Sequence, residues 1–304
     1  MFNTPTTQSE PTFRPDMLKA FSSAFGYAVE LFIVQNPERQ KPMWSTALFV
    51  RRRLGLTVGV RIPTLAYSPM ALTAEGQRLL SRKPDAFVEP LRALSNAFGQ
   101  VQLTLPPWFA DVRPFQWAGW EASPLYTALI DLRVTDLEAR WSASTRRTVR
   151  RHHAHYQFDA AHHAPDVVTT LLRESYTRQA RPLPAPPSAL QATLSALAPT
   201  DACAMPAVRA KKTGEIEACV ALLQHQHTAH YWLAGSRPGP AMSVLLDRVW
   251  SDARSRGLHT FDFIGANTPS IAEFKRRLGG RLVPYYHVAA HAHPLLRWRH
   301  RLSH

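Results

Sequence analysis

The sequence lacks any long hydrophobic run: no stretch approaches the roughly 18 consecutive apolar residues that span a bilayer. Its first residues also lack the basic start and apolar segment of a secretory signal. We therefore expect a protein with no transmembrane segment that stays in the cytoplasm. The two cysteines, Cys203 and Cys219, are not spaced as metal ligands, which favours reduced residues in a hydrophobic core.

Recognisable metal and nucleophile patterns are missing as well. Histidines cluster at 152–155, 162–163 and 225–230, but without cysteines or carboxylates at zinc spacing. No serine or cysteine stands in the setting of an activated nucleophile. The sequence therefore predicts neither a metal site nor a tightly bound cofactor, and a reaction without a covalent enzyme intermediate.

Negative charge is scarce, and the net charge of +14 is unevenly distributed. Up to Arg133 there are 14 basic and 10 acidic residues, which leaves 22 basic and 12 acidic residues for the rest, so the two parts carry +4 and +10. A positive field of this kind attracts tRNA, phosphorylated cofactors, nucleotide-linked sugars or anionic lipid surfaces, and it does not choose among them.

The chain of 304 residues is long enough for two domains that each bury a core. Apolar alternation and helical periodicity succeed one another along it, which indicates an α/β protein. We expect a disordered segment at 1–15, domains at 16–135 and 136–290, and a basic tail at 291–304. No internal repeat is visible.

One stretch near the C-terminus, residues 258–282, has the clearest local pattern. Leu258–Ile264 is a short apolar run with a single carboxylate, which predicts a buried strand. Gly265 ends this strand, Thr268 is a suitable N-cap before Pro269, and glycines at 279–280 close a helix of about ten residues.

On that helix Ile271, Phe274 and Leu278 form an apolar stripe, and Lys275 lies beside it. A lysine at the edge of a buried face is either a positioned cation or a snorkelling side chain whose ammonium reaches water. Asp262, in the preceding strand, is either part of the chemistry or a hydrogen-bonded buried carboxylate.

A second helix with a regular apolar face follows the turn at 237–240, directly after a predicted strand. Free backbone N–H groups and the helix dipole favour phosphate at such a helix start. The residues predicted to bind phosphate there are Arg237, Gly239, Ala241, Met242 and Ser243.

A basic helical segment at 137–156 repeats arginines four residues apart, at 146/150 and 147/151. Like charges at this spacing destabilise a helix by a few tenths of a kcal/mol each. Either the face is solvated, or the guanidinium groups bind phosphate oxygens.

The residues 261–265 (FDFIG) and 274–280 (FKRRLGG) resemble the closing motif of the Fem-type peptidoglycan-bridge aminoacyltransferases and their relatives in the GNAT acyltransferase superfamily. Leu278 stands where the family usually has an aromatic residue. The residues around 142–150 and 63–69 resemble the same family less specifically. The usual glycine-rich pyrophosphate signature is absent at 237–241.

This resemblance implies two tandem GNAT-like domains, each a mixed twisted sheet flanked by helices, with a cleft between them and no heptad arm. It implies a bacterial N-acyltransferase in which an amine attacks the acyl carbonyl directly. The co-substrate would be acyl-CoA, an acyl-carrier protein or aminoacyl-tRNA, and the acceptor a small-molecule, peptide or lipid-linked amine.

Roles for individual residues follow from the resemblance. Lys275 would stabilise the oxyanion or an acceptor phosphate, and Asp262 would orient it or assist deprotonation of the amine. We expect loss of the Lys275 side chain to leave the fold intact and abolish transfer. Candidate acceptor-side contacts are Trp44, Tyr67, Arg147 and Arg151.

The rival prediction is a non-catalytic GNAT-like module that uses its basic second half to bind RNA or another polyanion. The missing pyrophosphate signature favours this module, whereas the motif around Lys275 favours the enzyme.

Overall fold

The computed structural model describes residues 6–36, 39–53, 55–161 and 164–291, and the chain divides into two compact units. Unit 1 comprises Met1–Leu125 and Pro284–His304, and unit 2 comprises Tyr126–Val283. The division falls earlier than the expected boundary at 135/136, because the end of strand β7 (Glu121–Asp131) pairs with strand β13 (Thr260–Asp262) of unit 2. The chain then returns to unit 1, where β14 (Arg281–His291) pairs with β6 (Gln100–Leu105).

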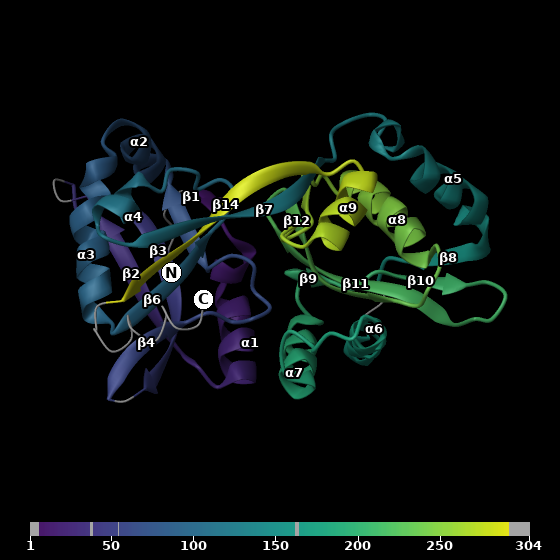
Figure 1. Cartoon of the computed structure of the whole chain (residues 1–304), viewed down its shortest axis with the longest axis horizontal. Helices are drawn as coiled ribbons and strands as arrows, with labels where there is room; N and C mark the ends of the chain where they lie inside the picture. The colour runs from purple at the N-terminus through teal and green to yellow at the C-terminus, as the bar shows by residue number, and fades with distance from the viewer. Residues whose placement is uncertain (1–5, 37–38, 54, 162–163, 292–304) are drawn as a thin grey trace. The chain divides into compact units, whose positions relative to one another are not determined.

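Unit 1 is a mixed sheet with helices on both faces. Its strand order is β1-β5-β3-β4-β6-β14, with β2 paired to β3. Helices α2, α3 and α4 lie on one face of the sheet and α1 on the other (Figure 1). The remaining elements are β1 (Thr6–Ser9), η1 (Pro11–Phe13), α1 (Pro15–Phe25), β2 (Ala28–Gln35), β3 (Pro42–Arg53), β4 (Leu56–Val60), β5 (Met70–Thr73), α2 (Ala74–Arg82), η2 (Pro84–Phe87), α3 (Val88–Ala97) and α4 (Arg113–Trp117).

The core of unit 1 is rich in aromatic side chains. Trp44 on β3 is fully buried and makes edge-to-face contacts with the rings of Phe32, Phe109 and Phe115. Phe115 in turn packs against Trp120. Phe109, Phe115 and Trp120 therefore stabilise this core, since ring pairs of this geometry add to the burial of apolar area.

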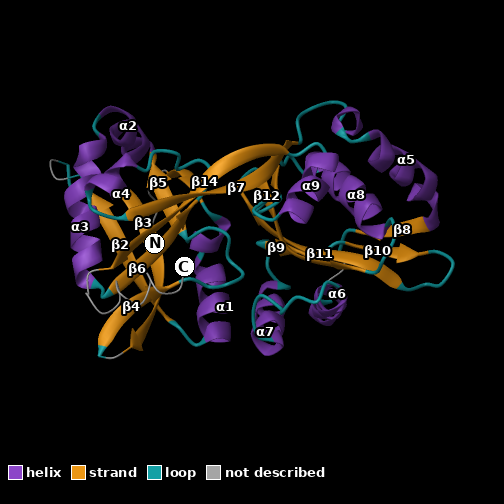
Figure 2. Cartoon of the chain, in the orientation of Figure 1, coloured by secondary structure: helices purple, strands orange, loops and turns teal. Residues whose placement is uncertain are grey.

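Unit 2 is also a mixed sheet between two helical layers. Its strand order is β7-β13-β12-β11-β10-β8, with β9 paired to β11. Helices α6 and α7 lie on one face, and α5, α8 and α9 on the other (Figure 2). The elements are η3 (Glu138–Arg140), α5 (Ala143–His152), η4 (His153–His155), β8 (Tyr156–Asp159), α6 (Pro165–Arg178), α7 (Pro187–Leu197), β9 (Cys203–Ala204), β10 (Ala207–Ala210), β11 (Ile216–His225), β12 (Thr228–Ser236), α8 (Ala241–Ser255) and α9 (Pro269–Arg277).

Helix α8 supplies much of the core of unit 2. Its buried residues include Leu245, Leu246, Val249 and Ala253, as the apolar periodicity predicted, whereas Met242 is half-buried at the edge of this cluster. Both cysteines are buried, and burial raises the pKa of each thiol to about 12, which keeps them protonated.

The expected disorder of the N-terminal segment was wrong for its described part. Residues 6–15 are ordered from Thr6 onward, because β1 pairs with β5 and Pro11–Phe13 forms a 3₁₀ turn; residues 1–5 lie outside the described residues. The expected basic tail lies outside the described residues, except for His291 at the end of β14. Within the described ranges, no helix combines the length and apolar character needed to cross a membrane.

Candidate active site

Strands β12 and β13 of unit 2 run parallel and then separate. They pair from Thr228↔Thr260 to His230↔Asp262, where β13 ends. Strand β12 continues to Ser236, paired on its other side with β11. In the described part of the chain, β12 therefore has no neighbouring strand on the β13 side beyond His230. An edge of this kind offers backbone N–H and C=O groups to a ligand.

A pocket of about 580 Å³ lies at this open edge, entirely within unit 2. Its walls come from β12, from α6, from the segment that follows β13 and from α9. The lining includes several aromatic rings, among them Tyr176, Tyr231, Trp232 and Phe274. The charged lining residues are Arg181 and Lys275, so the pocket has positive charge and no carboxylate in its lining.

Helix α6 closes the pocket from the face of the sheet opposite to α9 (Figure 2). Gly235 on β12 allows α6 to pack close against this strand. A Cβ atom at Gly235 would lie 2.2 Å from the carbonyl carbon of Leu171, so a larger residue would push α6 away. The close packing brings Leu172 and Tyr176 to the pocket. Arg181 follows the end of α6, where its guanidinium lies 5.9 Å from the ring centre of Tyr176.

Lys275 is buried, with only 4% of its surface exposed. Its Nζ donates to the carbonyl oxygens of Phe263 at 2.8 Å, Ile264 at 3.0 Å and Gly265. It also lies 5.6 Å from the ring centre of Phe263, within range of a cation–π contact. The three donors of the ammonium group are thus matched by three carbonyl groups.

This arrangement corrects the expectation that Lys275 only flanks the core. Leu278, directly after α9, packs in the core as predicted, but Ile271 and Phe274 on the helix are half-buried and line the pocket. Hydrophobicity places Lys275 beside the apolar stripe, whereas three converging carbonyl groups allow its charge to be buried. Its removal would leave those carbonyl groups without a donor, so we no longer expect an unchanged local structure.

Asp262 is buried and belongs to the same network. Its Oδ1 accepts from Thr127 Oγ1 at 2.6 Å and from the backbone N–H of Ile264 at 2.8 Å. The second of the two interpretations, a hydrogen-bonded buried carboxylate, describes these contacts.

Ile264 adopts an unusual backbone conformation, with φ at +50°. A β-branched residue rarely occupies this left-handed region, and such strain costs about 1–3 kcal/mol. Gly265 follows at φ +75°, where glycine has no steric penalty. The segment turns away from β12 at this point, so the strain accompanies the opening of the pocket.

Burial lowers the pKa of two side chains near the pocket. It lowers the pKa of the Lys275 ammonium to about 8, while the carboxylate of Asp262 acts in the opposite direction. Burial also lowers the pKa of His230, which is the register neighbour of Asp262 on β12. Burial therefore favours the neutral form of His230, whereas Asp262 acts in the opposite direction, and a fraction of Lys275 loses its proton under mildly alkaline conditions.

The predicted phosphate-binding residues surround the start of α8. Gly239 has φ +129° and open space around it, and no side chain caps the helix at Pro240. Arg237 forms an ion pair with Glu215. Met242 accepts a weak hydrogen bond from Tyr231 Oη at 3.5 Å, which connects this helix start to a pocket residue. Ala241 is buried and Ser243 is half-exposed.

The two arginine pairs on α5 differ in their environment. Arg150 forms an ion pair with Glu138 at 3.1 Å, and Arg146 donates to the carbonyl oxygen of Ala139 at 3.1 Å. Arg147 and Arg151 are exposed and form no ion pair with any described residue. The structure therefore leaves the second pair accessible to an anion.

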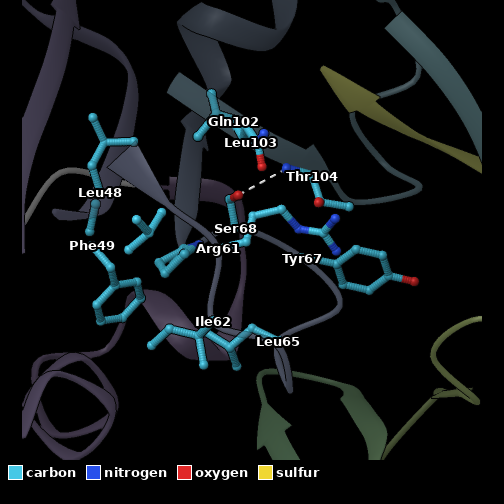
Figure 3. Close-up of a pocket in the computed structure, with 13 residues that line it drawn as sticks. Leu48, Phe49, Arg61, Ile62, Leu65, Tyr67, Ser68, Gln102, Leu103 and Thr104 are labelled. Atoms are coloured by element: carbon cyan, nitrogen blue, oxygen red, sulfur yellow. Dashed lines mark hydrogen bonds between the residues drawn. The ribbon is translucent and has the colours of Figure 1, made fainter. Parts of the chain in front are cut away.

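The acceptor-side residues predicted in unit 1 are both buried. Trp44 belongs to the core, and a ligand cannot reach it without disrupting the packing, so packing replaces the role predicted for it. Tyr67 lies at a small pocket together with Arg61 (Figure 3). The centre of its ring is 5.2 Å from that of Tyr285. This pocket holds about 20 Å³, roughly enough for one water molecule.

The region that forms the open-edge pocket matches a known domain family. Residues 139–276 match the acetyltransferase (GNAT) domain. Solved structures with the same architecture include a tandem GNAT protein from the clavulanic acid biosynthesis pathway, with 14% identity, a TM-score of 0.51, and coverage of 96% of this chain and 91% of that chain. The fold is that of the tandem GNAT proteins.

Two further structures extend the similarity of this GNAT fold. FemX is 10% identical with a TM-score of 0.66, and the match covers 92% of both chains. The C-terminal domain of a putative lysylphosphatidylglycerol synthetase from Agrobacterium fabrum is 14% identical with a TM-score of 0.58, over 93% of this chain and 88% of that chain. The comparison with curated proteins found no match. The expected resemblance to Fem-type relatives within the GNAT superfamily is confirmed.

Sequence patterns alone did not identify three features of the site: the open edge of β12, the left-handed Ile264 and the contact between Thr127 and Asp262. The only local signal was Gly265, which was expected to end the strand; the strand ends three residues earlier, at Asp262. Thr127 is 135 residues away from Asp262 in the sequence, and only the sheet brings the two together.

Proposed function

We propose that unit 2 binds an acyl donor along the open edge of β12 and catalyses transfer of its acyl or aminoacyl group to an amine. The observation that carries this proposal is the pocket of about 580 Å³ at the separation of two parallel strands. A linear donor arm can hydrogen-bond to the exposed strand edge as an added strand does.

The start of α8 supports the donor site. Strand β12 leads into α8 through the turn at 237–240, so the open edge and the helix start are contiguous. First-turn N–H groups at Ala241, Met242 and Ser243, together with the helix dipole, suit the phosphate groups of a nucleotide-linked donor. The donor classes that fit are acyl-CoA, an acyl-carrier protein and aminoacyl-tRNA.

The apolar lining suits the acyl end of such a donor. Ile271 and Phe274 present half-buried side chains to the pocket, beside the aromatic residues of β12. Burying this surface against a ligand is favourable at roughly 25 cal/mol per Å².

The acceptor in this proposal is a primary amine on a small molecule, a peptide or a lipid. Similarity to the domain of a putative lysylphosphatidylglycerol synthetase favours a lipid-linked acceptor. Exposed Arg147 and Arg151 are the candidate contacts for a phosphate on either substrate, and Tyr67 remains a candidate on the acceptor side.

The test measures donor binding to wild-type protein and to a variant with a filled pocket. Acetyl-CoA and an aminoacyl-tRNA are titrated separately by calorimetry. Ile271→Trp places a large ring in the pocket and should weaken binding of the true donor at least about tenfold, since that ring competes for the same space. Arg276→Trp, on the exposed side of the same helix, should bind normally.

Two results would contradict the proposal. One is that neither donor binds the wild-type protein, and the other is that Ile271→Trp and Arg276→Trp bind equally well. Binding of tRNA regardless of aminoacylation, with no consumption of either donor, would favour the non-catalytic module instead.

A further inference from the structure

Ile264 is held in its left-handed conformation from both sides. Asp262 Oδ1 accepts its N–H at 2.8 Å, and Lys275 Nζ donates to its C=O at 3.0 Å. Asp262 and Lys275, the two residues predicted to be catalytic, therefore both bind the backbone of Ile264. A strained conformation that is fixed by two buried charged residues points to a function for the peptide groups that it orients.

The peptide bond that follows Ile264 has a defined direction. It is trans, so the N–H of Gly265 points opposite to the C=O of Ile264 and hence away from Lys275 Nζ. Gly265 lines the pocket. No described residue accepts a hydrogen bond from this N–H, whereas Phe263, Ile264 and Ala266 each donate to a protein oxygen.

Lys275 also polarises this peptide group. An ammonium bound to the C=O of Ile264 withdraws electron density from the amide, which makes the N–H of Gly265 a stronger donor. Lys275 itself has no donor left over, since its three hydrogens match the carbonyl groups of residues 263, 264 and 265.

We propose that the backbone N–H of Gly265 stabilises the oxyanion of the transfer reaction, and that Lys275 is the positioning residue that orients and polarises it through the Ile264–Gly265 peptide bond. This inference rests on the proposed acyltransferase function.

In the reaction, the lone pair of the acceptor amine forms a C–N bond to the acyl carbon. The π electrons of the carbonyl group move to its oxygen, which accepts the Gly265 N–H. The carbonyl group then re-forms, the bond to the donor sulfur or oxygen breaks, and the amine proton passes through solvent to the leaving group. A backbone donor aimed at the developing oxyanion is worth about 10²–10³ in rate.

Kinetics separate this role from direct catalysis by Lys275. Lys275→Met keeps an unbranched stem but removes the ammonium, and it should lower the single-turnover rate of donor consumption about 10²–10³-fold. Adding Ile264→Gly to that variant should recover at least about tenfold, because glycine adopts φ +50° without strain and restores part of the amide orientation. Ile264→Gly alone supplies the reference rate, and Arg276→Met on the exposed face of α9 is the matched control.

The assay uses acetyl-CoA and an aminoacyl-tRNA as donors with a panel of primary amines, and donor affinity is measured for every variant. Recovery by glycine supports the positioning role. No recovery in a folded variant that binds donor overturns it, as does an unchanged rate in Lys275→Met. Absence of donor binding to the wild-type protein instead contradicts the proposed function and the inference together.

A spectroscopic experiment tests the amide directly. The chain has 13 glycines, so ¹⁵N-glycine labelling gives a simple spectrum in which Gly265→Ala identifies one resonance. A ketone analogue of acetyl-CoA, or an amide-linked aminoacyl-tRNA, should move the Gly265 proton downfield, and less so in Lys275→Met. If this resonance is unmoved when an analogue binds, Gly265 does not contact the acyl oxygen.

Discussion

Asp262 and Lys275 hold opposite ends of the same residue, Ile264. Asp262 accepts its N–H and Lys275 donates to its C=O, and a third contact fixes Asp262 to Thr127. These contacts fix the backbone that follows β13 at the point where β12 diverges. The local geometry of the pocket therefore depends on buried charges that the hydrophobic pattern of the helix does not explain.

The buried ammonium of Lys275 should make stability depend on pH. Its pKa falls from 10.5 in the unfolded chain to about 8 in the folded protein, where Asp262 is the carboxylate that opposes the shift. Between these values the unfolded state binds a proton that the folded state has lost, so the free energy of unfolding rises with pH across this window. Burial of the protonated ammonium lowers the free energy of unfolding by about 3 kcal/mol below pH 8, and this destabilisation is lost as the pH rises towards 10.5.

Urea unfolding of wild-type protein and Lys275→Met at several pH values from 7 to 10.5 checks this. Other titrating groups cancel in the difference between the two proteins. The difference should shift in favour of the wild type as pH rises, by about 3 kcal/mol. A difference that stays flat would show that Lys275 has the same pKa in both states.

Arg147 and Arg151 should contribute to binding of a polyanion, because they are exposed and form no ion pair with a described residue. If each contacts one phosphate, Arg147→Gln/Arg151→Gln should reduce the salt dependence of tRNA binding, with the slope of log K against log salt falling by about 1.4–1.8. The measurement is a fluorescence titration with total tRNA at several salt concentrations.

The control is the neighbouring pair on the same helix. Arg146→Gln/Arg150→Gln removes the same charge but acts on groups already engaged with the segment at 138–139. Equal changes in slope for the two double variants would show that net charge matters and that no specific phosphate contact exists.

Trp44 should affect stability and not substrate affinity. Its ring is fully buried among three other aromatic residues, so Trp44→Ala should lower the free energy of unfolding by about 3–5 kcal/mol. Trp44→Phe keeps most of the ring packing and should cost less. Denaturation measures both variants, and a raised KM in a stably folded Trp44→Phe protein would return this residue to the binding site.

Local sequence patterns determined a large part of the fold. Helix α8 forms where its apolar spacing predicts, and α9 begins at Pro269 after Thr268 and ends just before the glycines at 279–280. Each of these signals depends on neighbours a few residues away. These signals are legible because helix periodicity and termination depend on backbone geometry within one or two turns.

Tertiary structure decided the rest, because the decisive contacts join residues distant in sequence. Thr127 reaches Asp262 only through the pairing of β7 with β13, and the open edge of β12 exists only because β13 stops at Asp262. The sequence predicted the helix that carries Lys275, but it left open whether this residue is a positioned cation or a snorkelling side chain. Three carbonyl groups from another segment, converging where water is excluded, determine that its charge is buried and directed at the backbone.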